Sequence, residues 1–317
     1  LTADAADSFT EGHFTYSIYE DETGNKVAYI TDCNHAIPED VVIPSTLGGY
    51  PVKEIEGNAF SDCSNIRSVF IPNSVISIHP NAFPWCYNLT ALHADPDNTR
   101  YSSKDGVLFS KDQTVLTHYP QGIQNDKYTV PDGVTKIGSY AFFNQSYLTE
   151  VDIPSSVTVI APHAFEGAFI QSVVLPANLT EIGENAFTGA FIQSIAIPAG
   201  VEVIGSSAFS DCKYLTSVTI ADGVKHIGPY AFSGSSLENL FIPKSVVTVD
   251  ATVFSNCWNL TAIEVAENNP NYLSRDGILF NKAQTALIKY PQNNAVKDYG
   301  VPDGTTEVLP DAFSGCG

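Results

Sequence analysis

The sequence predicts a solenoid, an α/β repeat fold made mostly of short parallel β-strands, because two sequence markers recur with the same spacing. The first marker is an Ala-Phe pair, replaced once by Val-Phe, whose phenylalanines follow one another in steps of 22 or 23 residues, apart from two steps of 59. The second is an apolar residue followed by proline (once by alanine), which keeps these steps from Pro72 onward. The marker phenylalanines are Phe60, Phe83, Phe142, Phe165, Phe187, Phe209, Phe232, Phe254 and Phe313. A period of roughly 20–29 residues is typical of a right-handed leucine-rich-repeat superhelix.

One repeat unit reads YLTEVDIPSSVTVIAPHAFEGA. Leu148, Val151 and Ile153 have L-x-x-L-x-L spacing, which predicts a short strand with these side chains facing the core. The following proline ends the strand because it cannot donate a hydrogen bond to a sheet ladder. A second apolar segment comes next, and then a proline suited to the start of a short helical turn. Phe165 fills the centre of the coil, and stacked coils bury these side chains as one column.

Residues 1–40 lie outside the period and predict an N-terminal β cap. The stretch HFTYSIYEDETGNKVAYIT has two alternating β-patterns around EDETGN, which is typical of a β-hairpin. Such a hairpin would cover the first coil, whose core would otherwise be exposed. We therefore expect a cap over residues 1–40 and a repeat array over residues 41–317.

The two ends of the chain indicate a piece of a longer precursor. The chain begins LTADAADSF, without a basic segment followed by an apolar one, and it contains no methionine. We expect a mature or trimmed form from which a targeting segment has been removed. The chain stops at AFSGCG, inside a repeat unit, so we also expect the parent chain to continue past Gly317, with further domains.

The two long steps of 59 residues have the same cause. Each holds an insertion, near residues 95–127 and 266–298, and the two insertions are similar in sequence at an offset of 171 residues. In the first, VLFSKDQTVLTHY has two apolar runs around a polar tip, and an Asp-Gly turn signal precedes it. The pattern predicts two projecting β-hairpins, with tips at residues 111–113 and 282–284.

The composition excludes two classes of partner. The net charge is −20, and only 16% of the residues are charged, against about 25% in an average domain. A surface this acidic repels phosphate backbones and anionic lipid headgroups. No apolar run approaches the length of about 20 residues that a membrane span needs. We expect no nucleic acid as a partner and no direct membrane insertion.

The six cysteines favour packing over chemistry. Five of them lie three residues after a marker phenylalanine, in a column that otherwise holds mainly small residues: Cys63, Cys86, Cys212, Cys257 and Cys316. We expect buried thiols there, because free cysteine is among the most buried residue types. A bridge between Cys63 and Cys86, on adjacent coils, is the alternative. Cys33 lies outside the column and has no assignment. The sequence has no C-x-x-C pair, so it predicts no zinc site.

No motif for catalysis is present. The histidines are scattered over variable repeat positions, no serine or cysteine occurs in a nucleophile-elbow context, and H-E-x-x-H is absent. The sequence therefore predicts a protein that is not an enzyme and needs no cofactor and no metal.

Several units resemble a known family. The motifs IPSSVTVIAPHAF, IPAGVEVIGSSAF and IADGVKHIGPYAF, and the insertion DGVLFSKDQTVLTHYP, are similar to the BspA-like (Treponema-type) leucine-rich repeats. The resemblance covers residues 41–317. It implies a secreted or cell-surface protein of host-associated bacteria or protists, of a kind often discussed in terms of adhesion. It brings no catalytic motif, and partners differ between members.

The outward-facing positions of the L-x-x-L-x-L strands are the candidate binding residues. In the unit above, the position is Asp152, between two core-facing residues. The column holds Phe70, His93, Asp152, Val174, Ala196, Thr219, Phe241 and Glu264. Exposed aromatic and polar residues on a rigid concave sheet are typical anchors for a partner, whereas single exposed apolar residues are also normal in any protein. The candidates are Phe70, His93, Asp152, Thr219, Phe241 and Glu264.

These observations favour one functional hypothesis and leave two open. The first is an adhesion-type extracellular or cell-surface scaffold that binds a protein partner through its concave face and its projecting hairpins. The second is a carbohydrate-binding module, which would show exposed aromatic rings next to Asp, Asn or Gln in one groove. The third is a structural spacer that presents another domain, which would show a featureless concave face.

Overall fold

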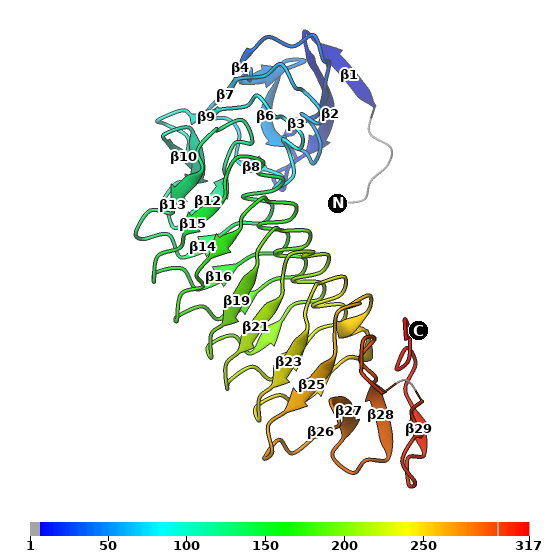
Figure 1. Ribbon diagram of the computed structural model, residues 1–317. Helices are drawn as coiled ribbons and strands as arrows, with labels where there is room; N and C mark the ends of the chain where they lie inside the picture. The colour runs from blue at the N-terminus through cyan, green and yellow to red at the C-terminus, as the bar shows by residue number, and fades with distance from the viewer. Residues whose placement is uncertain (1–6, 297, 317) are drawn as a thin grey trace. The chain divides into compact units, whose positions relative to one another are not determined.

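The computed structural model describes residues 7–296 and 298–316 (Figure 1). The fold is a mostly-β solenoid of about 12 turns with almost no helix. It divides into two compact units, which are described separately: unit 1 comprises residues 1–125 and 136–144, and unit 2 comprises residues 126–135 and 145–317. The expectations about the first residues of the chain and about Gly317 fall on residues 1–6 and 317, which lie outside the described residues.

Unit 1 begins with an antiparallel sheet whose strands bury alternate side chains. Strand β1 (Ser8–Glu11) pairs with β2 (Phe14–Glu20), and β2 pairs with β3 (Lys26–Cys33) across the EDETGN turn. The predicted cap was a two-stranded hairpin, and the structure differs from it in two details. A third strand, β1, extends it, and β3 also pairs in parallel with β6 (Tyr50–Ile55) of the first coil. The cap therefore continues the sheet of the first coil.

The remaining strands of the first coils form two rows. The L-x-x-L-x-L row of unit 1 is a parallel sheet of β4 (Asp40–Val42), β7 (Ser68–Ile71) and β9 (Ala91–Ala94). In the other row, β6 pairs in parallel with β8 (Ser77–Ile78), and β5 (Thr46–Leu47) pairs antiparallel with β6. One hydrophobic core runs from the cap through these coils.

A disulfide joins Cys33, at the end of β3, to Cys63 of the first coil. The expectation of a free packing thiol at Cys63 is therefore wrong, and so is the alternative pairing of Cys63 with Cys86. The period could not indicate the true partner, because Cys33 lies in the cap, outside the repeats. The thiols of Cys86, Cys212 and Cys257 are buried, as expected. Burial raises the pKa of Cys86 and of Cys212 to about 12, so both are unreactive at neutral pH.

The first insertion does not project from unit 1. It forms β10 (Tyr101–Lys104), β11 (Val107–Ser110) and β12 (Val115–His118), which pair antiparallel in this order, and β12 then pairs in parallel with β14 (Lys136–Ile137). Three successive residues of β11 are buried, so both faces of the strand are covered. The predicted projecting hairpin is therefore wrong in this detail: the insertion replaces part of a coil and completes the second strand row.

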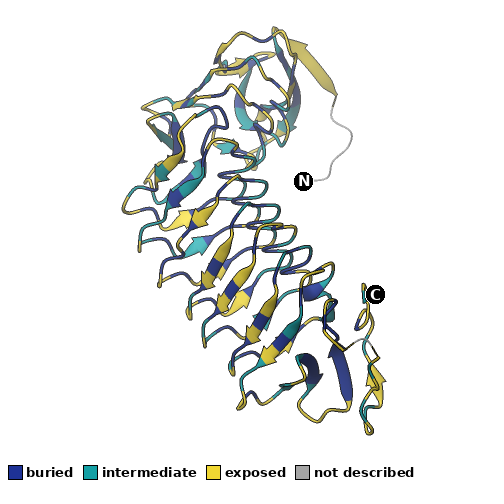
Figure 2. Ribbon diagram, in the orientation of Figure 1, coloured by how far each residue is buried: buried dark blue, intermediate teal, exposed yellow. Residues whose placement is uncertain are grey.

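Unit 2 repeats the two-row arrangement coil after coil, and in Figure 1 its L-x-x-L-x-L strands follow one another along one side. This first row consists of three parallel sheets: β13 (Lys127–Thr129), β15 (Glu150–Asp152) and β17 (Ser172–Val173); β19 (Ser194–Ile197) and β21 (Ser217–Ile220); β23 (Asn239–Ile242) and β25 (Ala262–Val265). The second row is one parallel run of β16 (Val159–Ile160), β18 (Glu181–Ile182), β20 (Val203–Ile204), β22 (His226–Ile227) and β24 (Thr248–Val249). Buried and exposed residues alternate along the first-row strands (Figure 2).

The marker phenylalanines form the predicted common spine in unit 2. Phe165, Phe187, Phe209 and Phe232 are fully buried. Successive ring centroids lie 4.9, 5.2 and 5.7 Å apart, with interplanar angles of 7°, 6° and 14°. The spacing matches the roughly 4.8 Å separation of hydrogen-bonded strands. Each coil therefore places its ring directly on the ring of the coil before.

The turns around these phenylalanines are not helical, contrary to the prediction. Among the described residues, the one helix is a 3-10 turn, η1 (Ala251–Phe254). In most coils, the residues two before and two after the marker phenylalanine have positive φ, as at Asn185 (54°) and Gly189 (68°) around Phe187. A left-handed residue on each side stops a right-handed helix from propagating. The repeat thus makes tight turns where helical turns were expected.

The second insertion lies near the end of unit 2 and repeats the first. Strands β26 (Tyr272–Arg275), β27 (Ile278–Asn281) and β28 (Ala286–Lys289) pair antiparallel, and β28 pairs in parallel with β29 (Glu307–Val308). This insertion does not project either, because all four residues of β28 are buried. No helix within residues 7–296 and 298–316 has the length and apolarity needed to cross a bilayer.

Candidate binding surface

The predicted binding residues of unit 1 lie side by side. Phe70 in β7 and His93 in β9 are register partners, and Val42 in β4 is the partner of Phe70 on its other side. Val42 and His93 are exposed, whereas Phe70 is half-buried. These three residues form a small mixed patch on the strand row of unit 1.

Asp152, the first candidate in unit 2, is engaged within the protein. Lys127 in β13 lies 2.9 Å from its carboxylate and 2.6 Å from that of Glu150. The hydrogen bond from Lys127 lowers the pKa of the Asp152 carboxyl. Thr129 donates a further hydrogen bond to Asp152. The sequence reasoning missed Lys127 because β13 follows the first insertion, where the L-x-x-L-x-L pattern is incomplete.

The other candidates of unit 2 are exposed on successive strands. Phe241 in β23 and Glu264 in β25 are register partners, and Thr219 in β21 is the partner of Ala196 in β19. The most exposed large apolar residue on this side is Val174, at 77%. We call the outward side of β15, β17, β19, β21, β23 and β25 the strand face of unit 2.

Beside the strand face lies a row of stacked aromatic rings that the sequence reasoning missed. The centroids of Phe169 and Phe191 are 4.1 Å apart at an interplanar angle of 16°, and those of Phe191 and Tyr214 are 5.1 Å apart at 26°. Phe169 and Tyr214 are 42% and 55% exposed. We call these three residues the aromatic ladder.

The signal for the ladder was present in the sequence. The hexapeptide GAFIQS occurs at Gly167 and again at Gly189, and in each copy phenylalanine comes directly before the first core-facing residue of the strand. Core packing explains the isoleucine of this hexapeptide, but it does not explain the phenylalanine. A repeated aromatic residue at a position outside the core indicates a surface row, because equivalent positions stack from coil to coil.

The strand face next to the ladder is polar and uncharged. Gln171, Ser172, Gln193 and Ser194 are exposed there. Their backbones belong to the ladder of hydrogen bonds between coils, as in the bond from the Gln171 amide to the Thr149 carbonyl. The surface is therefore pre-formed, and it offers both apolar area and neutral hydrogen-bonding groups.

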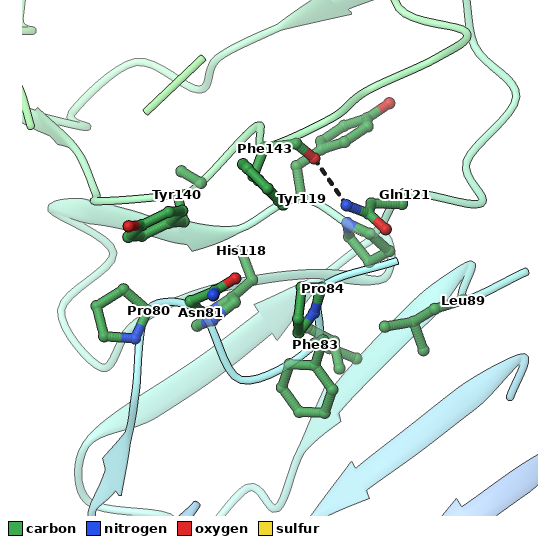
Figure 3. Close-up of a pocket in the computed structure, with 13 residues that line it drawn as sticks. Pro80, Asn81, Phe83, Pro84, Leu89, His118, Tyr119, Gln121, Tyr140 and Phe143 are labelled. Carbon is green, nitrogen blue, oxygen red and sulfur yellow. Dashed lines mark hydrogen bonds between the residues drawn. The ribbon is translucent and has the colours of Figure 1, made fainter. Parts of the chain in front are cut away.

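Unit 1 contains a small, partly open cavity that has room for water only. Its volume is about 30 Å³, and His118, Gln121, Tyr140 and Phe143 are among the residues around it (Figure 3). Gln121 donates a hydrogen bond to the carbonyl of Phe143. One water molecule needs roughly 10–15 Å³ of such space, so the cavity holds about two. Within residues 7–296 and 298–316, no three His, Cys, Asp or Glu residues are placed to hold a metal ion.

Solved structures similar to this chain include proteins of bacteria. A leucine rich cell surface protein from Faecalibacterium prausnitzii shares 25% identity and a TM-score of 0.48, over 99% of this chain and 69% of that one. The pneumococcal vaccine antigen PcpA shares 20% identity and a TM-score of 0.47, over 98% of this chain and 62% of that one. A leucine rich repeat protein of T. pallidum shares 24% identity and a TM-score of 0.37, over 69% of this chain and 86% of that one. No curated protein matches the chain.

The family assignment comes from the repeats themselves. The model of the BspA type leucine rich repeat region matches residues 38–110, 121–191 and 180–317, in 6 copies. These ranges cover most of the chain and contain the whole second insertion; of the first insertion they leave out residues 111–120, which include β12. They also agree with the predicted resemblance over residues 41–317. The chain belongs to the BspA-type leucine-rich-repeat family.

Proposed function

We propose that this chain is a non-enzymatic extracellular or cell-surface scaffold that binds a protein partner through the strand face of unit 2 and the aromatic ladder beside it. The observation that carries the proposal is the ladder. Its three rings stack on one another, and Phe169 and Tyr214 keep about half of their surface in solvent. Aromatic side chains dominate the energetics of protein interfaces.

The rigidity of the surface supports binding. Hydrogen bonds between coils fix the strand face, and the ladder rings are held by their neighbours. A pre-formed surface loses little conformational entropy when a partner docks. The spacer alternative predicts a featureless strand face, which the ladder disfavours. The hairpin part of the sequence hypothesis is dropped, because neither insertion projects.

The disulfide supports the location. Bonds such as Cys33–Cys63 persist in oxidising compartments and are rare in the cytosol. The resemblance to BspA-like proteins implies the same location. Removal of the disulfide by Cys63→Ser should lower the stability of unit 1 by about 3–4 kcal/mol, since the bond closes a loop of 30 residues.

The binding proposal is tested with ladder variants on an array of purified extracellular-matrix and serum proteins. The double variant Phe169→Ala/Phe191→Ala should weaken binding to any captured partner at least about tenfold. Tyr230→Ala is the matched control, because Tyr230 is 47% exposed but lies in a turn outside the ladder. The proposal fails if the double variant binds like the wild type, or if the wild type binds no protein of the array.

A further inference from the structure

A shallow groove on unit 2 lies outside the strand face, at the turns that precede the strands. Three successive coils line it at the same repeat position. The lining residues are Asp211, Lys213, Gly234, Ser235, Ser236, Asn256, Trp258 and Asn259. Trp258 is 60% exposed, an unusual state for the largest apolar side chain. The groove thus combines one open indole ring with amide, carboxylate, hydroxyl and ammonium groups.

The hydroxyls of Ser235 and Ser236 bond within the protein, to Cys257 and to the Lys213 carbonyl, but four other polar side chains of the groove are not used in this way. Across residues 7–296 and 298–316, the side chains of Asp211, Lys213, Asn256 and Asn259 make no hydrogen bond and no ion pair. The comparison with Asn88, which occupies the same repeat position as Asn259, is informative. The Asn88 amide donates to the Ser64 carbonyl of the preceding coil, as repeat packing requires. The Asn259 amide is left available to a ligand.

At two glycines, a side chain would collide with the residues that line the groove. A Cβ at Gly234 would lie 2.5 Å from a carboxylate oxygen of Asp211, so a side chain there would displace this group. A Cβ at Gly315 would lie 2.8 Å from Cζ3 of Trp258, which shows that the indole rests against the next coil. Both glycines have positive φ, at 69° and 77°. The indole therefore packs against the next coil before any ligand arrives, and the absence of a side chain at Gly234 leaves room for the Asp211 carboxylate.

The charge of the groove selects among ligand classes. Asp211 and Lys213 carry its only charges, and they have opposite signs. In a chain of net charge −20, such a neutral groove attracts neither a polyanion nor a polycation strongly. The lining spans two coil spacings, roughly 10 Å, which is the length of two pyranose rings. A standard protein interface involves about 20–30 residues on each side, far more than line this groove.

We propose that this groove is a subsite for a neutral oligosaccharide. The C–H face of a pyranose would stack on the indole of Trp258, whose ring face carries partial negative charge. Asp211 would accept hydrogen bonds from sugar hydroxyls, and the amides of Asn256 and Asn259 can both donate and accept. An apolar platform with a few convergent polar groups is the usual composition of a small-ligand site. The groove adjoins the end of the aromatic ladder, because Lys213 precedes Tyr214 and Ser236 has the ladder's repeat position in the next coil, but the two sites share no residue. The proposal does not depend on the proposed protein partner.

The chain offers a direct optical readout. It contains two tryptophans, Trp85 and Trp258. In the variant Trp85→Phe, all tryptophan fluorescence reports on the groove. Titration with neutral hexaoses (of β-1,4-glucose, β-1,3-glucose, N-acetylglucosamine and α-mannose) should give a saturable change for at least one of them at millimolar concentration. Molar salt should leave this binding unchanged, since no net charge is involved.

Variants then place the binding site. Calorimetry should show at least about tenfold weaker binding for Trp258→Ala, and a smaller loss for Trp258→Phe, which keeps an aromatic face. Tyr87→Ala is the matched control, because Tyr87 is 47% exposed at the equivalent repeat position of unit 1. The ladder variant Phe169→Ala/Phe191→Ala should bind the sugar normally, which separates this result from the test of the proposed function.

Three results overturn the inference. The first is that no neutral hexaose changes the fluorescence or gives heat. The second is that Trp258→Ala, shown to be folded by circular dichroism, binds like the wild type. The third is that only anionic saccharides or peptides bind and that molar salt abolishes their binding, which would assign the groove to another class of ligand.

Discussion

The two insertions, one in each unit, use the same backbone design, but the buried basic residue at the end of the third strand differs. In the first, the Tyr101 hydroxyl accepts a hydrogen bond from the backbone amide of Ile78 at 2.8 Å. In the second, the Tyr272 hydroxyl does the same for Val249 at 3.0 Å. Both copies also shift register at the same place in the middle strand pair. The conformation of the insertion is therefore a property of its sequence and recurs wherever that sequence occurs.

This basic residue is His118 in unit 1 and Lys289 in unit 2. His118 is buried and packs edge-on against Phe83, beside the backbone of His79 and Pro80. Lys289 is fully buried, and its ammonium donates to the carbonyl of Asp311 at 2.9 Å and to that of Ser314 at 3.5 Å. One niche thus holds a neutral ring, and the other holds a basic group surrounded by carbonyl oxygens.

This difference teaches how a buried basic side chain is tolerated. Burial penalises the charged form unless polar groups replace the lost water. At His118, burial is the largest cause of a pKa lowered to about 4, and the nearby His79 lowers it further. Burial also lowers the pKa of Lys289, but carbonyl groups replace part of its hydration. We therefore expect mild acid to weaken the first insertion through a group that the second lacks.

The largest expected loss of stability comes from replacing a buried asparagine that both insertions share. Asn98 is fully buried, donates to the carbonyls of Pro72 and Val75, and accepts from the amides of Arg100 and Tyr101. Asn98→Ala leaves these backbone groups buried without partners, at about 1–3 kcal/mol for each unsatisfied group. We expect a loss of about 4 kcal/mol in the free energy of unfolding of unit 1.

The sister residue Asn269 makes the same contacts, with the carbonyls of Pro243 and Val246 as its acceptors. Asn269→Ala should therefore cost unit 2 a similar amount. Denaturant titration followed by hydrogen exchange, which resolves the two units, measures both values. A large loss in one unit beside a loss under about 1 kcal/mol in the other would show that the two insertions are not equivalent.

The second prediction is that the stability of unit 1 depends on pH through His118. The pKa of its imidazole is about 4 in the folded protein, against 6.5 for the ordinary side chain. The unfolded chain therefore binds more protons between these values, so the stabilisation is complete above pH 6.5 and is lost as the pH falls toward 4. The shift corresponds to about 3 kcal/mol.

Hydrogen exchange of unit 1 at several pH values tests this window. His118→Leu should flatten the dependence between pH 6.5 and 4, because leucine does not titrate. An unchanged dependence in the variant would assign the acid sensitivity to other groups.

A structural feature could be predicted from the sequence when its residues recur at the repeat spacing of 22 or 23 residues. The spine of Phe165 and Phe187 was predictable, because stacking makes equal demands on every coil. The Cys33–Cys63 bond was not, because one partner lies in the cap. The burial of the insertions had a signal that was not used: Val107, Leu108 and Phe109 are three consecutive apolar residues, which indicates a strand covered on both faces.

The candidate site follows the same rule. The column through Phe241 and Glu264 was found because it repeats with the strands. The ladder at Phe169 and Phe191 repeats too, but at a position before the strand that the core pattern does not define. The groove at Trp258 cannot be predicted from the period at all. It depends on which side chains remain without hydrogen-bond partners, and only the folded structure shows this.

The third prediction concerns Lys289, the buried basic residue of the second insertion. Lys289→Ala removes the ammonium that pairs with the Asp311 carbonyl and leaves a cavity where its methylenes pack. We expect a loss of about 2 kcal/mol in unit 2, from the unpaired carbonyl and the cavity together. Urea denaturation at pH 7 measures it. A gain in stability would mean that the desolvation of the buried cation outweighs its hydrogen bonds.

The smallest effect is expected at the tips, where the two insertions were predicted to present binding residues. The Lys111 ammonium donates to the Pro96 carbonyl at 2.8 Å, and that of Lys282 donates to the Glu267 carbonyl at 3.0 Å. Both contacts are exposed to solvent, where water replaces a lost hydrogen bond. Lys111→Ala and Lys282→Ala should therefore leave the denaturation midpoint of each unit unchanged. The same two variants should keep the protein-array binding of the wild type, because both tips lie folded back on their own coils. If either variant lost binding while its stability stayed unchanged, the insertion tips would belong to the binding surface after all.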